Sequence, residues 1–346
     1  MLDYIIIGCG IGGIAFAETC LQNGKSVVVF DNNSQKSSKI AGGLYNPVIL
    51  KRFSGFKDAQ LQIDILNDFY AKIESKLQVQ FDFKLPILRK FFSIEEQNNW
   101  FAASDKPELA PFLSLNLIKT KFEGILSPFD YGEVLQAGYV DTEIYLSAYK
   151  NYLKSINAFQ EEPFIYDELV ASDYYVTYQN HVAKNIVFAE GFGLQHNPFF
   201  NQLPLDGTKG ELFIIKCLQL NLQLIINTSV FIIPLGDNLF KVGATYNWED
   251  KTDVPTDAGK KELIDKIKEI LDCDFEIVSH FAAVRPTVKD RKPLIGSHLI
   301  HKNMHILNGL GTRGVMLAPM MAKKLFEHIE YDIALEKDVD IKRFIK

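Results

Sequence analysis

The stretch DYIIIGCGIGGIAFAETCLQNGKSVVVFD, residues 3–31, decides the fold. It opens with a short apolar run that ends at a glycine, which is typical of a buried strand. Residues 11–23 then predict a helix that Gly24 ends as a C-terminal cap, and residues 26–31 predict a second strand. The chain therefore begins with a βαβ unit.

Three glycines join the first strand to the helix at the spacing Gly8-x-Gly10-x-x-Gly13. Gly8 permits the tight turn, Gly10 lets the backbone approach a pyrophosphate, and Gly13 lets the helix pack closely on the strand. The helix start supplies unpaired N–H groups and the positive end of a dipole. Asp31 ends the second strand, where it can bind both ribose hydroxyls and repel the 2′-phosphate of NADP. The alternative is a glycine-rich turn that binds nothing, and the flanking strands and the acid disfavour it.

The composition is that of a soluble globular protein. The chain has 346 residues, enough for about two domains, with 47% hydrophobic and 23% charged residues. A net charge of -6 disfavours general attraction to nucleic acid but leaves a local basic patch open. No Lys or Arg precedes the first apolar run, which is too short to span a membrane, so we expect a cytoplasmic protein. Four dispersed cysteines without a CxxC pair predict neither a disulfide framework nor a zinc site.

The rest of the chain alternates between helical and strand-like patterns. No clear cut or linker divides it, which favours two interleaved domains and an α/β fold that is α+β overall. Residues 78–135 are rich in phenylalanine and have no clean period. The other segments predict helices at about 58–77, 142–155, 256–271 and 316–329, strands at 174–178, 185–189, 275–286 and 305–308, and successive antiparallel strands within 211–244.

Three further features favour FAD over NAD. Ala41–Pro47 (AGGLYNP) is a glycine-containing loop that could approach a flat ring closely, and a strand in mid-chain ends at Gly191. The loop 309–314 (GLGTRG) leads into a helix whose start could stabilise a reduced flavin. Pro319 is tolerated there if that helix starts near Met316 or Leu317. The alternative for this loop is an ordinary helix start.

Six segments together resemble the D-amino-acid-oxidase-type family of FAD-dependent oxidoreductases. That family includes glycine oxidase, sarcosine oxidase and the FAD domain of the bifunctional enzyme that makes 5-methylaminomethyl-2-thiouridine in tRNA. The segments follow the family order from residue 5 to about 329: the N-terminal fingerprint, IAGGLYNP (40–47), GTKGE (207–211), VFIIP with FKVGAT (230–234 and 240–245), VRPTVKDRKPLIG (284–296) and LGTRGVMLAP (310–319).

This resemblance implies a Rossmann-like FAD-binding domain, 1–48, 140–208 and 285–346, interleaved with an antiparallel-sheet substrate domain, 49–139 and 209–284. FAD is expected to be non-covalent, because no cysteine lies near residues 290–315. The expected cofactor-binding residues occupy the glycine-rich turns and strand ends: Gly8, Gly10, Ile11, Gly12, Gly13, Asp31, Asn32, Ser38, Ala41, Gly42, Gly43, Leu44, Gly191, Gly309, Gly311, Thr312, Arg313, Gly314, Val315 and Met316.

The resemblance also implies oxidation of an amine beside a carboxylate. We expect hydride transfer from the α-carbon to flavin N5 and then hydrolysis of the imine. The substrate is expected to be a small amino acid or N-substituted glycine. Phe231 stands where glycine-oxidase-like sequences tend to carry a substrate-facing tyrosine.

Four residues are candidates for the catalytic site. Arg285 could hold the substrate carboxylate through two parallel hydrogen bonds, or instead pair with an acid such as Asp290. Arg313 could contact the flavin edge or the carboxylate, or be an exposed loop residue. Lys209 could border the active site or be solvated, and Tyr246 could cover the substrate or simply pack.

No metal is expected. The spacing of His298, His301 and His305 would suit a metal site on one helix, but the strand-like residues around them disfavour it.

Other functions stay open at this point. One is a tRNA-modifying oxidase that removes a carboxymethyl group from a wobble uridine, for which nucleic acid would be a partner only as substrate. The segment GLGTRG (309–314) favours this function, whereas the net charge and the missing methyltransferase domain disfavour it. A rim of basic residues around the flavin entrance would support it again. Another class is a non-catalytic FAD scaffold or sensor, expected if Arg285 points away from the flavin or Phe231 closes the cavity. An NAD dehydrogenase is a third. The sequence predicts neither an oligomeric state nor an electron acceptor.

Overall fold

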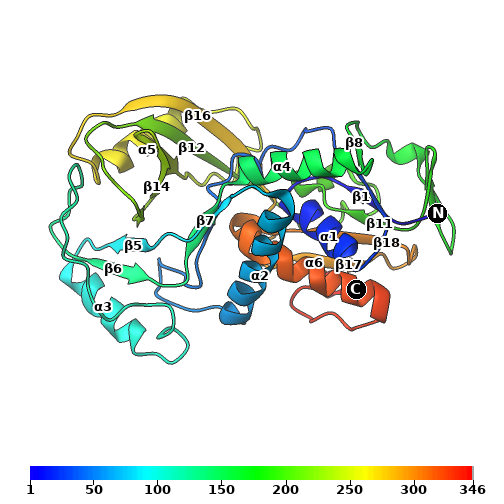
Figure 1. Ribbon diagram of the computed structural model, residues 1–346, viewed down its shortest axis with the longest axis horizontal. Coiled ribbons are helices and arrows are strands. Elements are labelled where there is room, and N and C mark those ends of the chain that lie inside the picture. The colour runs from blue at the N-terminus through cyan, green and yellow to red at the C-terminus, as the bar shows by residue number, and fades with distance from the viewer. Residues whose placement is uncertain (345–346) are drawn as a thin grey trace.

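The computed structural model describes residues 1–344, which form two halves, each built on a large sheet (Figure 1). The first sheet has the order β17-β18-β11-β1-β2-β8, with β10 on β11 and β9 on β10. Strand β1 runs parallel to β2 and β11, as the predicted βαβ unit requires. Its strands are β1 (Leu2–Ile7), β2 (Val27–Phe30), β8 (Phe159–Gln160), β9 (Val170–Ala171), β10 (Val176–Tyr178), β11 (His181–Phe188), β17 (Leu294–Ser297) and β18 (Met304–Asn308).

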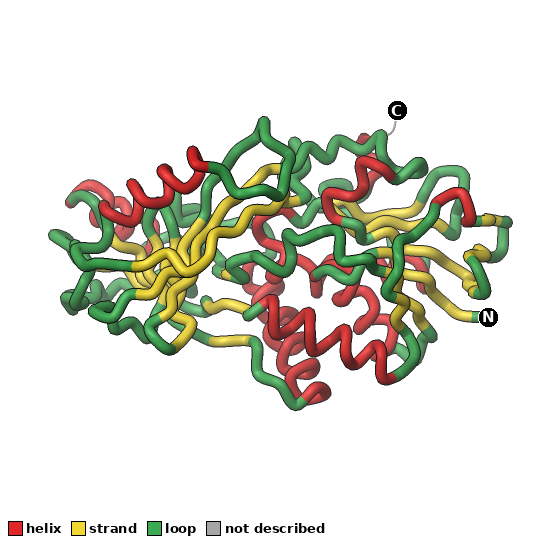
Figure 2. The backbone as a smooth tube through the Cα atoms, turned by 90° about the horizontal axis from the view of Figure 1, so that it is seen from above, coloured by secondary structure: helices red, strands yellow, loops and turns green. Residues whose placement is uncertain are grey.

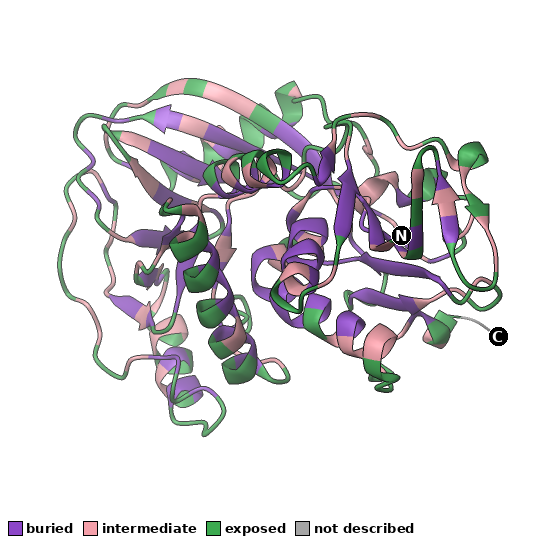
Figure 3. Cartoon of the chain, turned by 45° about the vertical axis from the view of Figure 1, so that its right-hand side comes forward, coloured by how far each residue is buried: buried purple, intermediate pink, exposed green. Residues whose placement is uncertain are grey.

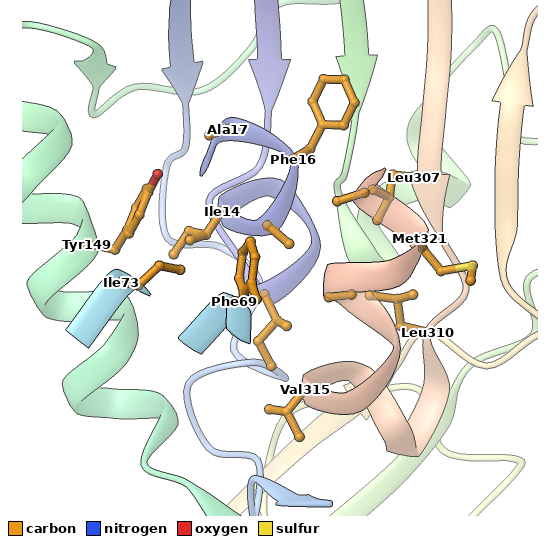
Figure 4. Close-up of a cluster of buried hydrophobic side chains, with 14 of the residues drawn as sticks. Ile14, Phe16, Ala17, Phe69, Ile73, Tyr149, Leu307, Leu310, Val315 and Met321 are labelled. Carbon is orange, nitrogen blue, oxygen red and sulfur yellow. The ribbon is translucent and has the colours of Figure 1, made fainter. Parts of the chain in front are cut away.

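Helices cover one face of the first sheet and enclose a large apolar core (Figure 4). They are α1 (Ile11–Gln22), α2 (Ala59–Leu77), α4 (Thr142–Ser155) and α6 (Gly314–Tyr331). Helix α2 lies in the segment that we predicted with the substrate domain. Its apolar residues repeat every three or four positions, so one face of the helix packs against α6 and α4. The opposite face of the sheet carries loops and the short 3₁₀ helices η1 (Tyr166–Glu168) and η2 (Gly191–His196).

Helix α6 begins at Gly314, earlier than the expected start at Met316 or Leu317, so Pro319 lies inside the helix. Proline has no N–H, and the Val315 carbonyl therefore lacks its usual donor four residues on. The Tyr70 hydroxyl of α2 donates to this carbonyl at 2.7 Å. A hydrogen bond between helices thus offsets the break and joins α2 to α6.

The second sheet has the order β16-β12-β15-β14-β13-β5-β6. The strands predicted within 211–244 are confirmed, and neighbours pair antiparallel except β13 with β5, which is parallel. Residues 78–135 supply β5, β6 and α3, short elements separated by long loops, which explains their missing period. The elements are β5 (Ile87–Lys90), β6 (Tyr131–Val134), β12 (Thr208–Lys216), β13 (Ile225–Asn227), β14 (Phe231–Gly236), β15 (Leu239–Gly243), β16 (Glu276–Arg285), α3 (Ile94–Ser104) and α5 (Asp257–Lys268).

A small third sheet and two further 3₁₀ helices complete the described chain. The sheet joins β3 (Leu44–Tyr45), β7 (Gly138–Val140) and β4 (Asp82–Phe83), and the helices are η3 (Gly311–Arg313) and η4 (Ile341–Phe344). The tube view shows strands of the second sheet reaching toward the helices of the first half (Figure 2). The α/β prediction, with one parallel-centred and one mainly antiparallel sheet, is confirmed.

Burial follows these layers: the strands of the first sheet are mostly buried, whereas much of α3 and α5 is exposed (Figure 3). No helix within residues 1–344 is both long and apolar enough to cross a membrane. All four cysteines are free, although the fold brings the Cys217 and Cys273 sulfurs to 3.3 Å.

Candidate active site

A cavity of about 2010 Å³ runs from the N-terminal fingerprint to the second sheet. Pockets for one small ligand usually span roughly 300–1,000 Å³, so this cavity has room for a dinucleotide and a substrate together. Every residue expected to bind the cofactor lines it except Gly13. Segments far apart in the chain thus meet at one place: residues 7–12, 30–46, 189–193 and 307–317.

The fingerprint glycines are required by close approaches of the backbone. Gly8 has φ +99°, which favours glycine, and a Cβ built there would overlap the Ala189 carbonyl. A Cβ on Gly13 would overlap the carbonyl oxygen of Gly8. Gly13 therefore permits helix–strand packing from beneath the cavity, as its place in the motif predicts.

Asp31 and Ser38 contact the turn that leads into α1. The Cys9 N–H donates to Asp31 Oδ2 at 2.6 Å, and the Ile11 N–H donates to Ser38 Oγ at 3.2 Å. The Lys150 ammonium lies 3.8 Å from the Asp31 carboxylate. The N-cap residue of α1 is Gly10, which has no side chain that could cap the helix. The N-cap residue of α6 is Arg313, whose side chain makes no capping hydrogen bond. These two helix starts and the glycine cradles around them fit the phosphates and the ring of FAD.

The loop that should face the flavin is packed against the second sheet. Gly43 has φ +71°, and a Cβ on Gly42 would lie 2.6 Å from Cζ of the Phe231 ring. The Lys241 ammonium of β15 donates to the Ala41 carbonyl at 3.3 Å, and burial lowers the pKa of this lysine. Phe231 lines the cavity but leaves it open.

Arg285 ends β16 and lines the cavity. Its Nη1 donates to the Thr245 carbonyl at 3.3 Å, and the guanidinium carbon lies 4.7 Å from the centre of the Tyr246 ring. A Cβ on Gly210 would overlap the guanidinium, so only glycine leaves room for it. The alternative partner Asp290 binds Arg343 instead, at 2.9 Å. Across residues 1–344 no carboxylate pairs with Arg285, and burial lowers its pKa while leaving it charged.

Arg313 is the second arginine in the cavity wall. Its guanidinium carbon lies 4.4 Å from the centre of the Phe56 ring. Its Nη1 atom is buried and makes no hydrogen bond within the described chain, and burial lowers the pKa of the side chain. The structure thus brings Arg285, Arg313 and Tyr246 to one cavity.

Lys209 is not brought there. Successive residues of a strand face opposite sides, so Thr208 and Gly210 line the cavity while Lys209 faces away from it. Its buried ammonium donates to Asp250 Oδ2 at 2.5 Å and to the Val254 carbonyl at 2.5 Å. We therefore correct its expected place beside the substrate.

Glu190 is a cavity residue that the sequence analysis missed. It follows β11, and its carboxyl group accepts hydrogen bonds from the Tyr166 hydroxyl and from Asn197 Nδ2, the latter at 2.8 Å. Burial raises the pKa of Glu190 to about 7. The available signal was an acid at the end of a buried strand, directly before Gly191.

The three histidines at 298, 301 and 305 do not converge on a common point. The rings of His298 and His301 stack with centres 5.1 Å apart. His305 is buried in β18 between Ser297 and Asn185, and burial lowers its pKa to about 3. Within residues 1–344 no group of three or more His, Cys, Asp or Glu residues could hold a metal ion.

Comparison with known proteins gives the same picture over most of the chain. Residues 3–328 match the family described as FAD dependent oxidoreductase. A tRNA 5-methylaminomethyl-2-thiouridine biosynthesis bifunctional protein of Campylobacter jejuni is 23% identical over 305 residues, which cover 84% of this chain and 45% of that protein. Glycine oxidase of Bacillus subtilis is 25% identical over 209 residues, 56% of each chain. The chain spans about half the length of these curated relatives.

Solved structures share the fold. Glycine oxidase from Geobacillus kaustophilus matches with a TM-score of 0.77 at 15% identity, over 97% of this chain and 96% of that one. Iminodiacetate oxidase from Chelativorans sp. BNC1 matches with a TM-score of 0.79 at 16% identity, over 97% of this chain and 98% of that one.

Proposed function

The chain belongs to the FAD-dependent oxidoreductase family, and from this premise we propose that it oxidises the C–N bond of an N-substituted glycine or a small amino acid. FAD is the cofactor of this family and, when bound, would supply the acceptor for a hydride from the substrate α-carbon. The α1 and α6 starts and the loop at 41–44 would hold it. The observation that carries the proposal is Arg285, a cation in the cavity wall that has no acidic partner among residues 1–344.

The chain's own residues would mainly position the substrate. Arg285 would bind the carboxylate through two parallel hydrogen bonds, since only one of its five donors is engaged. Tyr246 would cover the bound group, and Arg313 would add positive charge. The second sheet presents no carboxylate or imidazole to this part of the cavity, which is formed by Thr208, Gly210, Leu212, Phe231, Gly243, Ala244, Phe281 and Ala283. The amine would therefore arrive neutral, and orientation would supply most of the catalysis.

A non-catalytic scaffold or sensor is less well supported. It would be favoured by an Arg285 that turns away or by a cavity filled by Phe231, and neither describes this site. We also expect the protein to work in a reducing compartment such as the cytoplasm, which suits its four free cysteines.

A second candidate is a tRNA-modifying oxidase that removes a carboxymethyl group, which presents the same glycine-like unit to Arg285. Lys51, Arg52 and Arg291 are exposed cavity residues without an ion pair in the described chain. Arg291 lies against the partly exposed Trp248, at 5.9 Å from the ring centre. Cations interleaved with an aromatic ring suit a nucleic acid substrate.

The test is an anaerobic visible spectrum of the purified holoenzyme. Glycine, sarcosine, a larger N-substituted glycine and a tRNA bearing carboxymethylaminomethyl uridine are added separately. Bleaching of the flavin band by a free amino acid supports the first candidate, and bleaching by the tRNA alone supports the second. A band that none of them bleaches, in protein that holds FAD, would refute both.

A further inference from the structure

The segment 246–254, here called the strap, joins β15 to α5 and crosses the edge of the cavity. Tyr246 and Trp248 at its start line the cavity. Its later residues, 250–254, meet Lys209, which faces away from the cavity. The strap contains no helix or strand, apart from one isolated bridge between Asn247 and Lys209. Its position therefore depends on side-chain contacts.

One set of those contacts comes from the single buried side chain of Lys209. Lys251, which donates to Asp206 Oδ1 and to the Gly207 carbonyl, and an ion pair between Lys36 and Asp253 supply others. The Lys209 ammonium has three acceptors in the strap: Asp250 Oδ2 at 2.5 Å, the Val254 carbonyl at 2.5 Å and Thr252 Oγ1 at 3.2 Å. Three acceptors satisfy all three donors of an ammonium group. The Lys209 and Asn247 backbones also exchange hydrogen bonds at 2.8 and 3.0 Å. The main chain of Lys209 thus holds the beginning of the strap, and its side chain holds the end.

The beginning of the strap is in contact with Arg285. The Tyr246 ring lies over the guanidinium at 4.7 Å, and the Thr245 carbonyl accepts its only hydrogen bond in the described chain. On β12, Lys209 is also the neighbour of Gly210, against which the guanidinium rests. Glu211 of β12 holds Thr245 through two hydrogen bonds, so a displaced strap would take the Tyr246 ring away from the guanidinium and leave the Thr245 hydrogen bond in place.

We propose that Lys209 is a positioning residue, which holds the strap so that the Tyr246 ring keeps the Arg285 guanidinium oriented toward the substrate carboxylate. The inference rests on the proposed function for the identity of that carboxylate. It assigns Lys209 a role without substrate contact, and it predicts that residues of the strap far from the substrate share this role. Asp250 is the foremost of these, because its carboxylate lies 2.5 Å from the Lys209 ammonium, nearer than the 3.9 Å of Glu211, and belongs to the strap.

The test compares Lys209→Met and Asp250→Asn with Lys261→Met, a control that removes an exposed ion pair from α5. Both strap variants should raise KM about tenfold, the value of one lost charged hydrogen bond, with little change in kcat. Acetate affinity, measured from the flavin spectrum without turnover, should fall by the same factor. The variant that combines Lys209→Met with Asp250→Asn should have the same KM and acetate affinity as Lys209→Met alone. The control Lys261→Met should have the KM and acetate affinity of the wild type.

Quenching of tryptophan fluorescence by acrylamide measures directly how far the strap is exposed to solvent. The chain has two tryptophans, and Trp100 is fully buried, so quenching reports Trp248. Both strap variants should expose Trp248 further. Unchanged acetate affinity with an exposed Trp248 would overturn the proposal, and so would weakened affinity with unchanged quenching. If Lys209→Met does not fold, the comparison is made with Asp250→Asn, which changes the more exposed residue of the same ion pair. A wild type that binds acetate but oxidises no amine would refute the proposed function alone.

Discussion

Replacement of Arg285 by methionine tests the centre of the proposed site. Methionine keeps much of the length of the side chain but removes its charge and all five donors. In the structure only Thr245 accepts a hydrogen bond from this guanidinium, at 3.3 Å, so the other donors are available to a ligand. Loss of one partner of a buried charge pair costs about 2–5 kcal/mol. The value of kcat/KM should therefore fall by about 30-fold to about 5,000-fold.

The same change should leave the protein folded. A half-buried cation that pairs with no carboxylate of residues 1–344 is a cost to the native state, so the Arg285→Met variant should keep or exceed the wild-type free energy of unfolding. Activity is measured by anaerobic flavin reduction with the best substrate, and stability by urea unfolding of the same preparation. Arg285→Lys should recover only part of the activity, because an ammonium cannot bind a carboxylate bidentately. Wild-type kcat/KM in the methionine variant would refute the carboxylate role.

Three further predictions address the fold and the cofactor end of the cavity. Tyr70→Phe leaves the Val315 carbonyl without a donor and should cost about 1–3 kcal/mol in urea unfolding; an unchanged midpoint would contradict this account of Pro319. Gly13→Ala places a Cβ against the Gly8 carbonyl and should abolish FAD retention on a desalting column, which a yellow, fully loaded variant would disprove. Glu190 keeps its proton in the native state up to a pKa of about 7, whereas the unfolded chain loses it near 4.5, so stability should fall with rising pH between these values by about 3 kcal/mol. Glu190→Gln should remove this decline in apoprotein, and an identical pH profile would show that Glu190 is not its source.

The nucleotide-binding half of the fold could be predicted because its signals are local. The apolar run before Gly8 and the acid at Asp31 report their own positions in a βαβ unit. The early start of α6 could not be predicted, since its tolerance of Pro319 depends on Tyr70, about 250 residues away. The parallel pairing of β5 with β13 is likewise a long-range contact that no local pattern encodes.

The site divides in the same way. The glycine-rich turns identified the cofactor end, and a residue at a strand end, Arg285, identified the substrate end. The segment GTKGE (207–211) predicts that Lys209 borders the active site, but the alternation of side chains along β12 places Lys209 on the opposite face from Thr208 and Gly210. Glu190 was missed because its raised pKa arises from burial, which the residue type does not reveal.

The order of strands in the first sheet also constrains how the protein is made. Strand β1 is synthesised first, yet it pairs with β11, which in turn pairs with β18, about 300 residues later. At roughly 5–20 residues per second a ribosome needs about 15–60 s to supply that strand and α6. Throughout this interval the nascent chain carries an apolar strand with an open edge and half of a nucleotide site. From this topology we expect chaperones to bind the nascent chain during translation. We also expect FAD to bind only after α6 has been synthesised.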